Sequence, residues 1–433
     1  MRTMTKDWAS RLRMAGAACI IAMGSAVTAH AQATIGLYEL ARFNLSSTSG
    51  TGNSQYVGSN PIAVGWNGSK LYVAGQNASG ATGTTAIVEI TNAATAAAGG
   101  GAGFVTPTFS SAFGALSTVN GQGYRGLAMQ GNQLAAAWDN ATNSPNGIQM
   151  FNATTNTRTW NLTNNGTSTT ANIGTTRGMS GPDFDPGYVV SGTSQGGAGL
   201  GWVTQGQGRR FLNDQTSGTA IYTPTANNPA GAQQGMIINT VPTSTTWRDF
   251  GFDPATGDLY TRNQNGVTRT NRTGVNTDAD PNTSTAGQSA LIWTQPTAGN
   301  NIATNLGFMN AVVSSTVGAF SNPYSGSLLV FNDRSSTASG QAWTSVIQFT
   351  STSGSSITPT WTFLSTPATG NAAYDFEWDS ASQTLAVVDY ENRNVSIFST
   401  AVPEPSTTAI AGMCSIGLAS LMLRGRRRSE NNS

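Results

Sequence analysis

The sequence predicts an all-β protein in which one large polar region lies between two short apolar ends. Only 9% of the 433 residues are charged and 38% are hydrophobic, while glycine alone accounts for 51. This composition is too polar for a multispanning membrane protein and carries too little charge for the highly charged kind of disorder. Short β-rich runs that end in Asp, Asn and Gly turns recur along the central region, which favours strands joined by tight reversals.

Residues 1–31 have the three parts of a secretion signal. An apolar stretch, 14–29, follows a basic start and closes on Ala29-His30-Ala31; the basic residues are Arg2, Lys6, Arg11 and Arg13. We expect cleavage after Ala31, because small residues at Ala29 and Ala31 suit the processing enzyme. Lipidation at Cys19 fits poorly, since the apolar stretch continues beyond it. An uncleaved signal anchor is the alternative.

The C-terminal end also has three parts. A proline-rich motif comes first, an uncharged stretch of 17 residues (407–423) follows, and an arginine cluster ends it; the motif is Val402, Pro403, Glu404, Pro405 and Ser406, and the cluster is Arg424, Arg426, Arg427 and Arg428. As a helix rising about 1.5 Å per residue, the stretch is about 26 Å long, near the lower limit for a hydrocarbon core of about 30 Å. The arginines favour the cytoplasmic side, so the central region should face outward.

This order of motif, span and basic stop resembles the PEP-CTERM sorting signal of exosortase-processed bacterial proteins. The resemblance covers residues 401–428, and a polar tail, 429–433, follows it. It implies that an exosortase recognises Pro403, Glu404 and Pro405, removes the tail and releases the protein from the inner membrane toward the cell surface or exterior, often alongside exopolysaccharide. An ordinary single-span anchor after a proline-rich linker is the alternative.

The region between these ends, 32–400, has an unusual inventory of reactive side chains. It holds 17 acidic and 13 basic residues, a net charge of −4, so it lacks the basic footprint of a nucleic-acid-binding protein. His30, Cys19 and Cys414 all lie outside it. A Ser-His-Asp triad, a cysteine nucleophile, the usual zinc sites and disulfides are therefore excluded. Paired carboxylates and oxygen-ligated Ca²⁺ or Mg²⁺ remain.

The central region repeats a unit made of a β-rich run, a turn and a second run. Successive markers of the unit lie 55 to 70 residues apart: Leu71, Leu134, Val189, Leu259, Leu328 and Leu385. In the clearest copy, 249–261, apolar residues alternate on both sides of a Pro- and Gly-containing turn, which predicts a hairpin. A looser copy begins at Asp183 with DFDPGYVVSG.

These units resemble the blades of β-propellers. The resemblance implies six or seven blades over 32–400, and we expect the early strand 35–43 to complete the final blade beside 395–398. A closed ring would remove exposed sheet edges. Tandem β-sandwiches and a β-solenoid are the alternatives, although the repeat is too long for a simple solenoid coil.

Several acidic and aromatic residues are candidates for a site. A propeller hydrolase or lyase that binds one divalent cation could draw one carboxylate from each unit, and the candidates are Glu89, Asp139, Asp183, Asp249, Asp333 and Glu377. The sequence does not show that they converge. We interpret the groups Asp183 with Asp185, and Asp375 with Glu377 and Asp379, mainly as turn and strand-edge residues, and the tryptophans mainly as core. The Asp278 to Ser284 segment departs from the EF-hand pattern and is interpreted as a solvated loop.

The favoured hypothesis is a non-enzymatic, exported surface or matrix protein that binds polysaccharide or a protein partner. It rests on the two ends of the sequence, on the neutral hydroxyl-rich composition and on the lack of His and Cys in the central region. We assign no catalytic or metal-binding residue and no cofactor, with Ca²⁺ as the ion that the remaining side chains would suit best. The alternative is the divalent-cation-dependent hydrolase or lyase. Four oxygen ligands from different units meeting at one point would favour it.

Overall fold

The architecture was obtained from a computed structural model of the chain. The structure describes residues 38–46, 56–77, 83–101, 103–118, 123–139, 146–164, 179–186, 188–190, 193–195, 199–204, 210–214, 247–254, 256–263, 266–270, 290–294, 306–309, 328–334, 345–351, 373–389 and 392–399. All of these belong to the unit Ile35–Ser433. The predicted signal (1–31, with Ala29 and Ala31) and the predicted sorting signal (401–428) lie outside the described residues.

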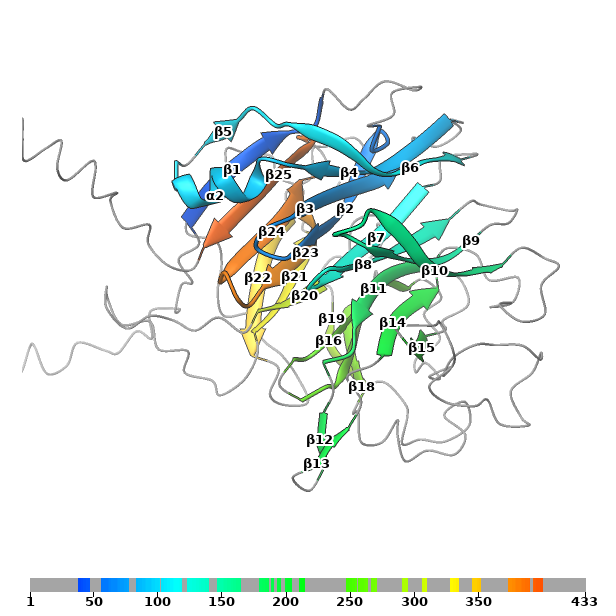
Figure 1. The fold of residues 1–433 in the computed structure, drawn as a ribbon. Coiled ribbons are helices and arrows are strands. Elements are labelled where there is room, and N and C mark those ends of the chain that lie inside the picture. The colour runs from blue at the N-terminus through cyan, green and yellow to red at the C-terminus, as the bar shows by residue number, and fades with distance from the viewer. Residues whose placement is uncertain are drawn as a thin grey trace, which may run out of the picture. The chain divides into compact units, whose positions relative to one another are not determined.

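The described residues are almost entirely β-strand, which confirms the predicted all-β class (Figure 1). The largest sheet has the order β10-β9-β8-β7-β3-β4-β6, and β2 also pairs with β3. Its strands are β2 (Asn60–Trp66), β3 (Leu71–Gln76), β4 (Gly83–Ile90), β6 (Phe109–Thr118), β7 (Gly123–Gln130), β8 (Gln133–Asp139), β9 (Asn146–Asn152) and β10 (Thr157–Asn164). Only the pair Gln76 and Gly123 joins β3 to β7.

Four smaller sheets come from the middle of the chain. Their orders are β11-β14-β15, β12-β13, β16-β17-β18-β19 and β20-β21-β22. The strands are β11 (Met179–Phe184), β12 (Tyr188–Val190), β13 (Thr193–Gln195), β14 (Gly199–Thr204), β15 (Arg210–Asp214), β16 (Trp247–Phe252), β17 (Leu259–Asn263), β18 (Gly266–Thr270), β19 (Ala290–Thr294), β20 (Leu306–Met309), β21 (Leu328–Arg334) and β22 (Ser345–Ser351).

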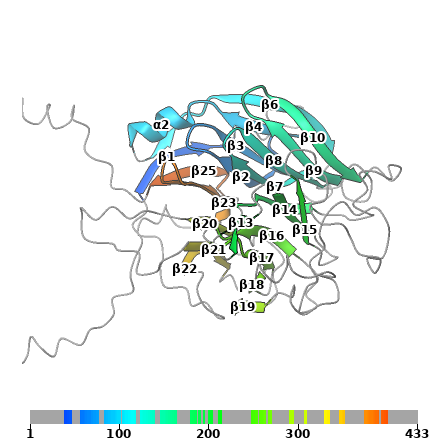
Figure 2. The same cartoon turned by 60° about the horizontal axis from the view of Figure 1, so that its bottom comes forward.

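The last sheet combines both ends of the described chain in the order β23-β24-β25-β1-β5. It contains β1 (Tyr38–Asn44), β5 (Phe104–Val105), β23 (Ala373–Asp379), β24 (Thr384–Asp389) and β25 (Asn394–Ser399). β1 runs antiparallel to β25, with Tyr38 opposite Ser399 and Asn44 opposite Asn394. The prediction that an early strand completes the final unit is therefore confirmed. The short helix α2 (Ala93–Gly99) contacts β1 (Figure 2).

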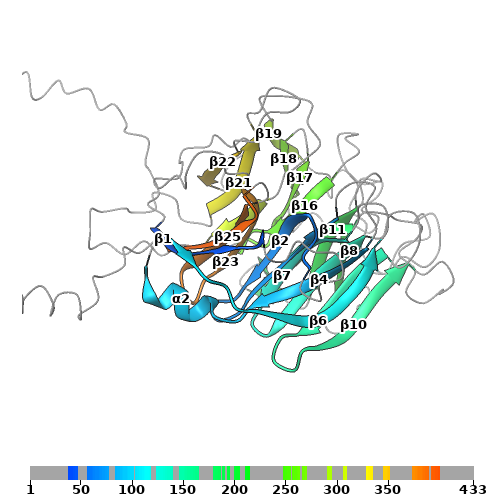
Figure 3. The ribbon, with the colours of Figure 1, turned by 90° about the horizontal axis from the view of Figure 1, so that it is seen from above.

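Six strands from these sheets form a closed circuit of neighbours. Each contacts the next in the order β2, β7, β11, β16, β20 and β23, and β23 contacts β2 (Figure 3; β20 is labelled in Figure 1). We call them the ring strands. The contact of β23 with β2 brings together residues about 310 positions apart in the sequence, including a hydrogen bond with a sequence separation of 311 residues.

Most ring strands contain the same irregularity near their start. The register against the neighbouring strand shifts once in β2, β7, β11, β16 and β23. The first paired residues after these β-bulges are Ala63, Gly126, Asp183, Asp249 and Asp375, and we call their place the bulge position. In β11 the bend requires Gly181, whose φ is +54° and whose added Cβ would lie 2.1 Å from Asp249 Oδ1. Repeated bulges bend the strands alike and align their side chains.

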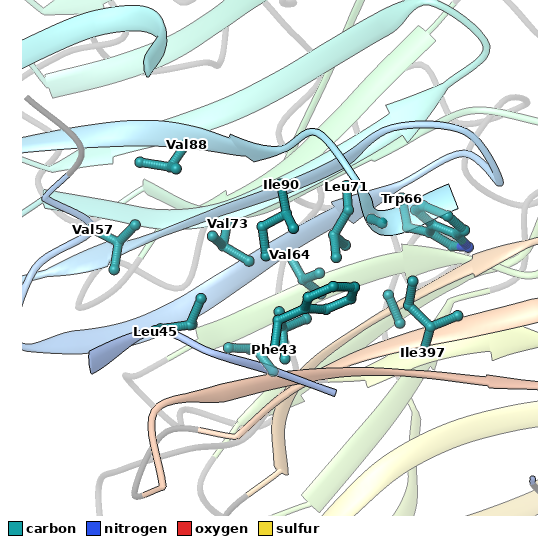
Figure 4. Close-up of a cluster of buried hydrophobic side chains, with 14 of the residues drawn as sticks. Phe43, Leu45, Val57, Val64, Trp66, Leu71, Val73, Val88, Ile90 and Ile397 are labelled. Atoms are coloured by element: carbon teal, nitrogen blue, oxygen red, sulfur yellow. The ribbon is translucent and has the colours of Figure 1, made fainter. Parts of the chain in front are cut away.

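The main apolar core lies where the first and last sheets meet. Phe43 of β1, Leu71 of β3 and Ile397 of β25 are each 0% exposed and belong to one cluster (Figure 4). Trp66 of β2 joins it, and its indole Nε1 donates a buried 2.7 Å hydrogen bond to Thr384 Oγ1 of β24. Burial of apolar surface between distant segments thus supports the pairing of β1 with β25.

The predicted hairpins are partly confirmed. β16 and β17 are antiparallel with Phe252 opposite Leu259, and their turn is closed by a 2.7 Å bond from Gly257 N to Asp253 O. The hairpin predicted from the copy at Asp183 is wrong. Its second run, β12, pairs with β13, whereas β11 pairs with the later strand β14. Both copies have a proline at the same place, Pro186 and Pro254, so the difference lies in the length of the connection: three residues separate β11 from β12, whereas six separate β16 from β17.

No helix among the described ranges has the length and apolar character needed to cross a bilayer. The predicted span, 407–423, is not among those ranges.

Candidate functional site: the ring cavity

Four ring strands and the turns that follow them line a cavity of about 210 Å³, which we call the ring cavity. Its lining includes residues of β7, β11, β16 and β23. At about 30 Å³ per water molecule, it has room for about seven waters, or one small ring. The turn residues that border it are exposed: Gln130, Pro186, Pro254 and Ser380. These four form the rim.

Three carboxyl groups of the lining occupy the bulge position. Asp375 Oδ2 of β23 accepts a buried 2.9 Å hydrogen bond from Val64 N of β2. Asp183 of β11 accepts bonds from Phe252 N of β16 at 2.7 Å and from its own neighbour Phe184 N at 2.8 Å. Each of these two aspartates therefore ties its ring strand to the next one in the circuit, satisfying backbone donors on the strand edge that faces away from its own sheet. Asp249, 4% exposed, has the same place in β16.

Glu377 is the fourth carboxyl group of the lining and lies two residues past the bulge position of β23. Its Oε1 is 3.5 Å from Met129 N on β7, so its side chain reaches past the strand next to its own. Burial raises the pKa of Glu377 well above the usual carboxyl value, and the negative charges of Asp183, Asp375 and Asp249 raise it further, against a small opposing effect of the Met129 amide.

Asp183 is also electrostatically perturbed. Burial raises its pKa to about 7, although the backbone bonds from Phe252 and Phe184 act in the opposite direction, and the nearby charge of Asp185 adds to the rise. Two of the four carboxyl groups in the cavity, Asp183 and Glu377, therefore take up a proton more readily than an ordinary carboxyl group.

The described lining of the ring cavity contains no Lys, Arg or His. With four acidic side chains and no basic one, the cavity disfavours phosphates, sulfates and uronic acids, whose negative charge would be buried without a partner. The remaining lining consists of apolar and aromatic residues such as Leu127 and Phe250 and of backbone groups. The cavity suits ligands that are neutral or cationic.

The structure brings together three of the six carboxylates that the sequence analysis named as candidates. Asp183, Asp249 and Glu377 share the ring cavity. Asp139, 0% exposed, instead pairs with Arg125 at 2.5 Å, and Glu89 of β4 lies 3.4 Å from Lys70 Nζ. These two belong to structural ion pairs. Asp333 lies on β21 opposite Val346, and only its backbone is described.

Asp375 was missed as a member of the candidate set. The signal was present, because DF begins three of the repeated runs, DFDP, DFGF and DFEW, but only one acid was taken from each unit. The interpretation of the closely spaced acids as structural residues holds for Asp375 and for Asp379, whose Oδ2 accepts a 2.7 Å bond from Ser382 N in the following turn. Glu377 has no such role in a turn.

The tryptophans described with their side chains are mainly core residues, as predicted. Trp66 and Trp138 are each 1% exposed, and Trp138 packs edge-on against Tyr124 with ring centres 4.7 Å apart. Trp378 is half-buried and borders the ring cavity.

In the described part of the chain, no group of three or more His, Cys, Asp or Glu side chains has an arrangement that could hold a metal ion. The carboxyl groups of the ring cavity are thus near enough to influence one another but are not arranged as metal ligands. The Asp278 to Ser284 segment lies outside the described residues.

Comparison with known proteins assigns no family. No family model and no curated protein matches the chain. Among solved structures, an auxiliary nutrient binding protein from Bacteroides thetaiotaomicron VPI-5482 is 12% identical with a TM-score of 0.47, over 84% of this chain and 76% of that one. A chain of a mitotic checkpoint complex is 10% identical with a TM-score of 0.39, over 80% of this chain and 89% of that one. Likeness at this level carries no functional argument.

Proposed function

We propose that this protein is an exported binding module whose ring cavity takes one uncharged sugar unit of an extracellular polysaccharide. The observation that carries the proposal is the convergence of Asp183, Asp249, Asp375 and Glu377, from three ring strands, on one cavity with an exposed rim. Binding sites for small molecules combine a concave, largely apolar lining with a few convergent polar groups. The ring cavity has the convergent polar groups, and polar atoms make up more of its exposed surface than apolar atoms do.

The electrostatics of the cavity support an uncharged polyhydroxylated ligand. Each sugar hydroxyl both donates and accepts a hydrogen bond, and a set of ionised and protonated carboxyl groups offers both kinds of partner. The raised pKa values of Asp183 and Glu377 favour the protonated form of these two groups, which can donate a hydrogen bond. The apolar lining supplies surface for the C–H face of a sugar ring, and the lack of a basic residue in the described lining disfavours anionic sugars.

We further propose that the domain 32–400 is a six-bladed β-propeller. Two observations support the count: the closed circuit of six ring strands, and the sheet in which β1 lies beside β25. In this interpretation each ring strand is the innermost strand of one blade, and the ring cavity lies within the circle of inner strands. Such a ring would leave only short sheet edges at its outside.

We propose a destination for the protein from the two ends of its sequence. The signal at 1–31 and the PEP-CTERM-like segment at 401–428 support export, transient anchoring through 407–423 and release by an exosortase to the cell surface. A polysaccharide of the cell exterior would then be within reach of the ring cavity. A protein partner on the surface is the alternative ligand.

We expect the released protein to end near Pro403 to Ser406. Mass spectrometry of protein recovered from the cell surface or medium should find no peptide beyond Arg424, because the tail remains in the membrane after cleavage. Glu404→Ala, which removes the charge of the motif, should leave the tail attached. An intact arginine-rich tail on released wild-type protein would refute processing.

The sugar proposal predicts that blocking the rim abolishes binding. Ser380→Trp places a bulky side chain at the rim, whereas Ala381→Trp places it one residue further along the same exposed turn, outside the lining. Against a panel of neutral, anionic and amine-bearing oligosaccharides measured by calorimetry, wild type and Ala381→Trp should bind neutral members alike, and Ser380→Trp should lose at least about tenfold in affinity. Absence of binding across the panel, or equal binding by both variants, would contradict the proposal.

The convergence of Asp183, Asp249 and Glu377 is the observation behind a second candidate, the divalent-cation-dependent hydrolase or lyase, although the described carboxyl groups are not arranged as metal ligands. Carboxyl groups with separated pKa values can act as acid and base toward one bond. The same oligosaccharide panel distinguishes the two candidates: product release that EDTA abolishes and Ca²⁺ restores would favour the enzyme over the binding module.

A further inference from the structure

Three of the ring strands carry a small residue at one place where β23 carries an acidic one. Two residues past the bulge position, β2, β7 and β16 carry Gly65, Ala128 and Gly251. β11 ends before the corresponding residue, Asp185, which is 1% exposed and does not border the ring cavity. At this place β23 carries Glu377.

The pattern shows that the fold needs no large side chain at this place. At Gly65 an added Cβ would already lie 3.0 Å from Leu134 Cδ1 and 3.1 Å from Met129 Cγ, so packing there favours a small residue. Packing of the ring strands therefore does not require a large side chain at the position of Glu377.

Glu377 also differs from the bulge aspartates in its hydrogen bonding. Asp183 and Asp375 accept bonds of 2.7 and 2.9 Å from neighbouring ring strands, which gives each a structural role. The contact of Glu377 with Met129 N, at 3.5 Å, is at the outer limit of a hydrogen bond and ties the strands only weakly. Meanwhile its carboxyl group lies near three other acids. A residue that adds repulsion without a clear structural bond is typical of a functional position.

We propose that Glu377 is the ligand-contacting carboxyl group of the ring cavity and that it hydrogen-bonds to two neighbouring hydroxyl groups of a sugar ring, while the bulge aspartates hold the ring strands together. This inference rests on the proposed function and names the residue that hydrogen-bonds to the ligand. The two oxygens of one carboxyl group can engage adjacent hydroxyls at once. The raised pKa of Glu377 supports contact with an uncharged group, because a protonated carboxyl donates one bond and accepts another.

The test compares two substitutions of Glu377 in the full-length chain, held in lipid nanodiscs so that no detergent sugar competes. Methyl glucopyranoside, galactopyranoside and mannopyranoside serve as probes, and binding is followed by saturation-transfer NMR with competition. Glu377→Gln keeps the shape and both kinds of hydrogen-bonding atom, so we expect affinity within about threefold of wild type. Glu377→Leu removes the hydrogen bonds, so we expect a loss of at least about tenfold.

Matched controls separate this role from a structural one. Glu89 undergoes the same changes, Glu89→Gln and Glu89→Leu, but lies outside the cavity beside Lys70, and sugar affinity should not change. The melting temperature should not fall in either Glu377 variant, because each removes an acidic group that lies near three other acids, at a place where β2, β7 and β16 have Gly or Ala. A fall of several degrees together with lost binding would assign Glu377 to the structural acids and overturn the inference.

The outcomes distinguish the inference from the proposed function. If Ser380→Trp blocks binding but Glu377→Leu binds like wild type, the cavity binds sugar without Glu377, and only the inference fails. If Glu377→Gln loses as much affinity as Glu377→Leu, a negative charge is required, which would overturn the hydroxyl contact in favour of a cationic ligand. If wild type binds none of the probes, both proposals fail.

Discussion

Phe43→Ala should lower the free energy of unfolding by about 3–5 kcal/mol, the range for truncating a buried phenylalanine. Phe43 is 0% exposed and belongs to the core cluster between the last sheet, which contains β1, and the first sheet (Figure 4). The cavity left behind would weaken the attachment of β1 to β25, and with it the closure of the circuit. Urea denaturation followed by circular dichroism measures the change in midpoint.

Tyr38→Ala is the matched control for this substitution. Tyr38 starts the same strand and is 37% exposed, so its truncation should cost less than about 1 kcal/mol. Equal losses for the two variants, or a loss below about 1 kcal/mol for Phe43→Ala, would show that β1 does not pack as the structure places it.

Asp139→Ala should also cost about 3–5 kcal/mol, because it removes one partner of a buried ion pair and leaves a charge without its counterion. Asp139, at the end of β8, is 0% exposed and lies 2.5 Å from Arg125 Nε of β7, whose side chain is 13% exposed. The pair joins adjacent strands beside the one paired position of β3 with β7, Gln76 opposite Gly123. Denaturant unfolding again supplies the measurement.

The double variant Asp139→Ala with Arg125→Ala tests whether the loss comes from the pair. Removing both charges should recover part of the stability lost in Asp139→Ala, giving a coupling energy of at least about 1 kcal/mol. Glu89→Ala, which breaks a more exposed contact with Lys70, should cost at most about 1 kcal/mol. Additive losses in the cycle would contradict a coupled pair.

Local sequence patterns predicted much of the fold. Alternating residues around a Pro- and Gly-containing turn defined the hairpin of β16 and β17. The early strand was correctly matched to β25 from the expectation that the repeated units resemble blades of a closed ring. The pairing of β12 was predicted wrongly because no local pattern identifies its partner strand. A run such as Tyr188–Val190 shows strand propensity but does not specify which strand it pairs with.

The candidate site could be predicted only in part. The recurring DF runs marked Asp183, Asp249 and Asp375, but whether they face one cavity depends on bulge register and on the contact of β23 with β2, both set by tertiary packing. The distinction between Glu377 and the bulge aspartates needs the aligned ring strands, since in sequence all of them are closely spaced acids. Long-range register, unlike hairpin pairing, leaves no local signature.

The central claim is that the ring cavity binds an uncharged sugar unit. A crystal structure of the protein with a methyl glycoside or neutral oligosaccharide that binds in solution tests it most directly. We predict one sugar ring inside the rim formed by Gln130, Pro186, Pro254 and Ser380, with two hydroxyl oxygens within about 3 Å of the carboxyl oxygens of Glu377. A bound sugar located on another surface, with the ring cavity holding only water, would contradict the account.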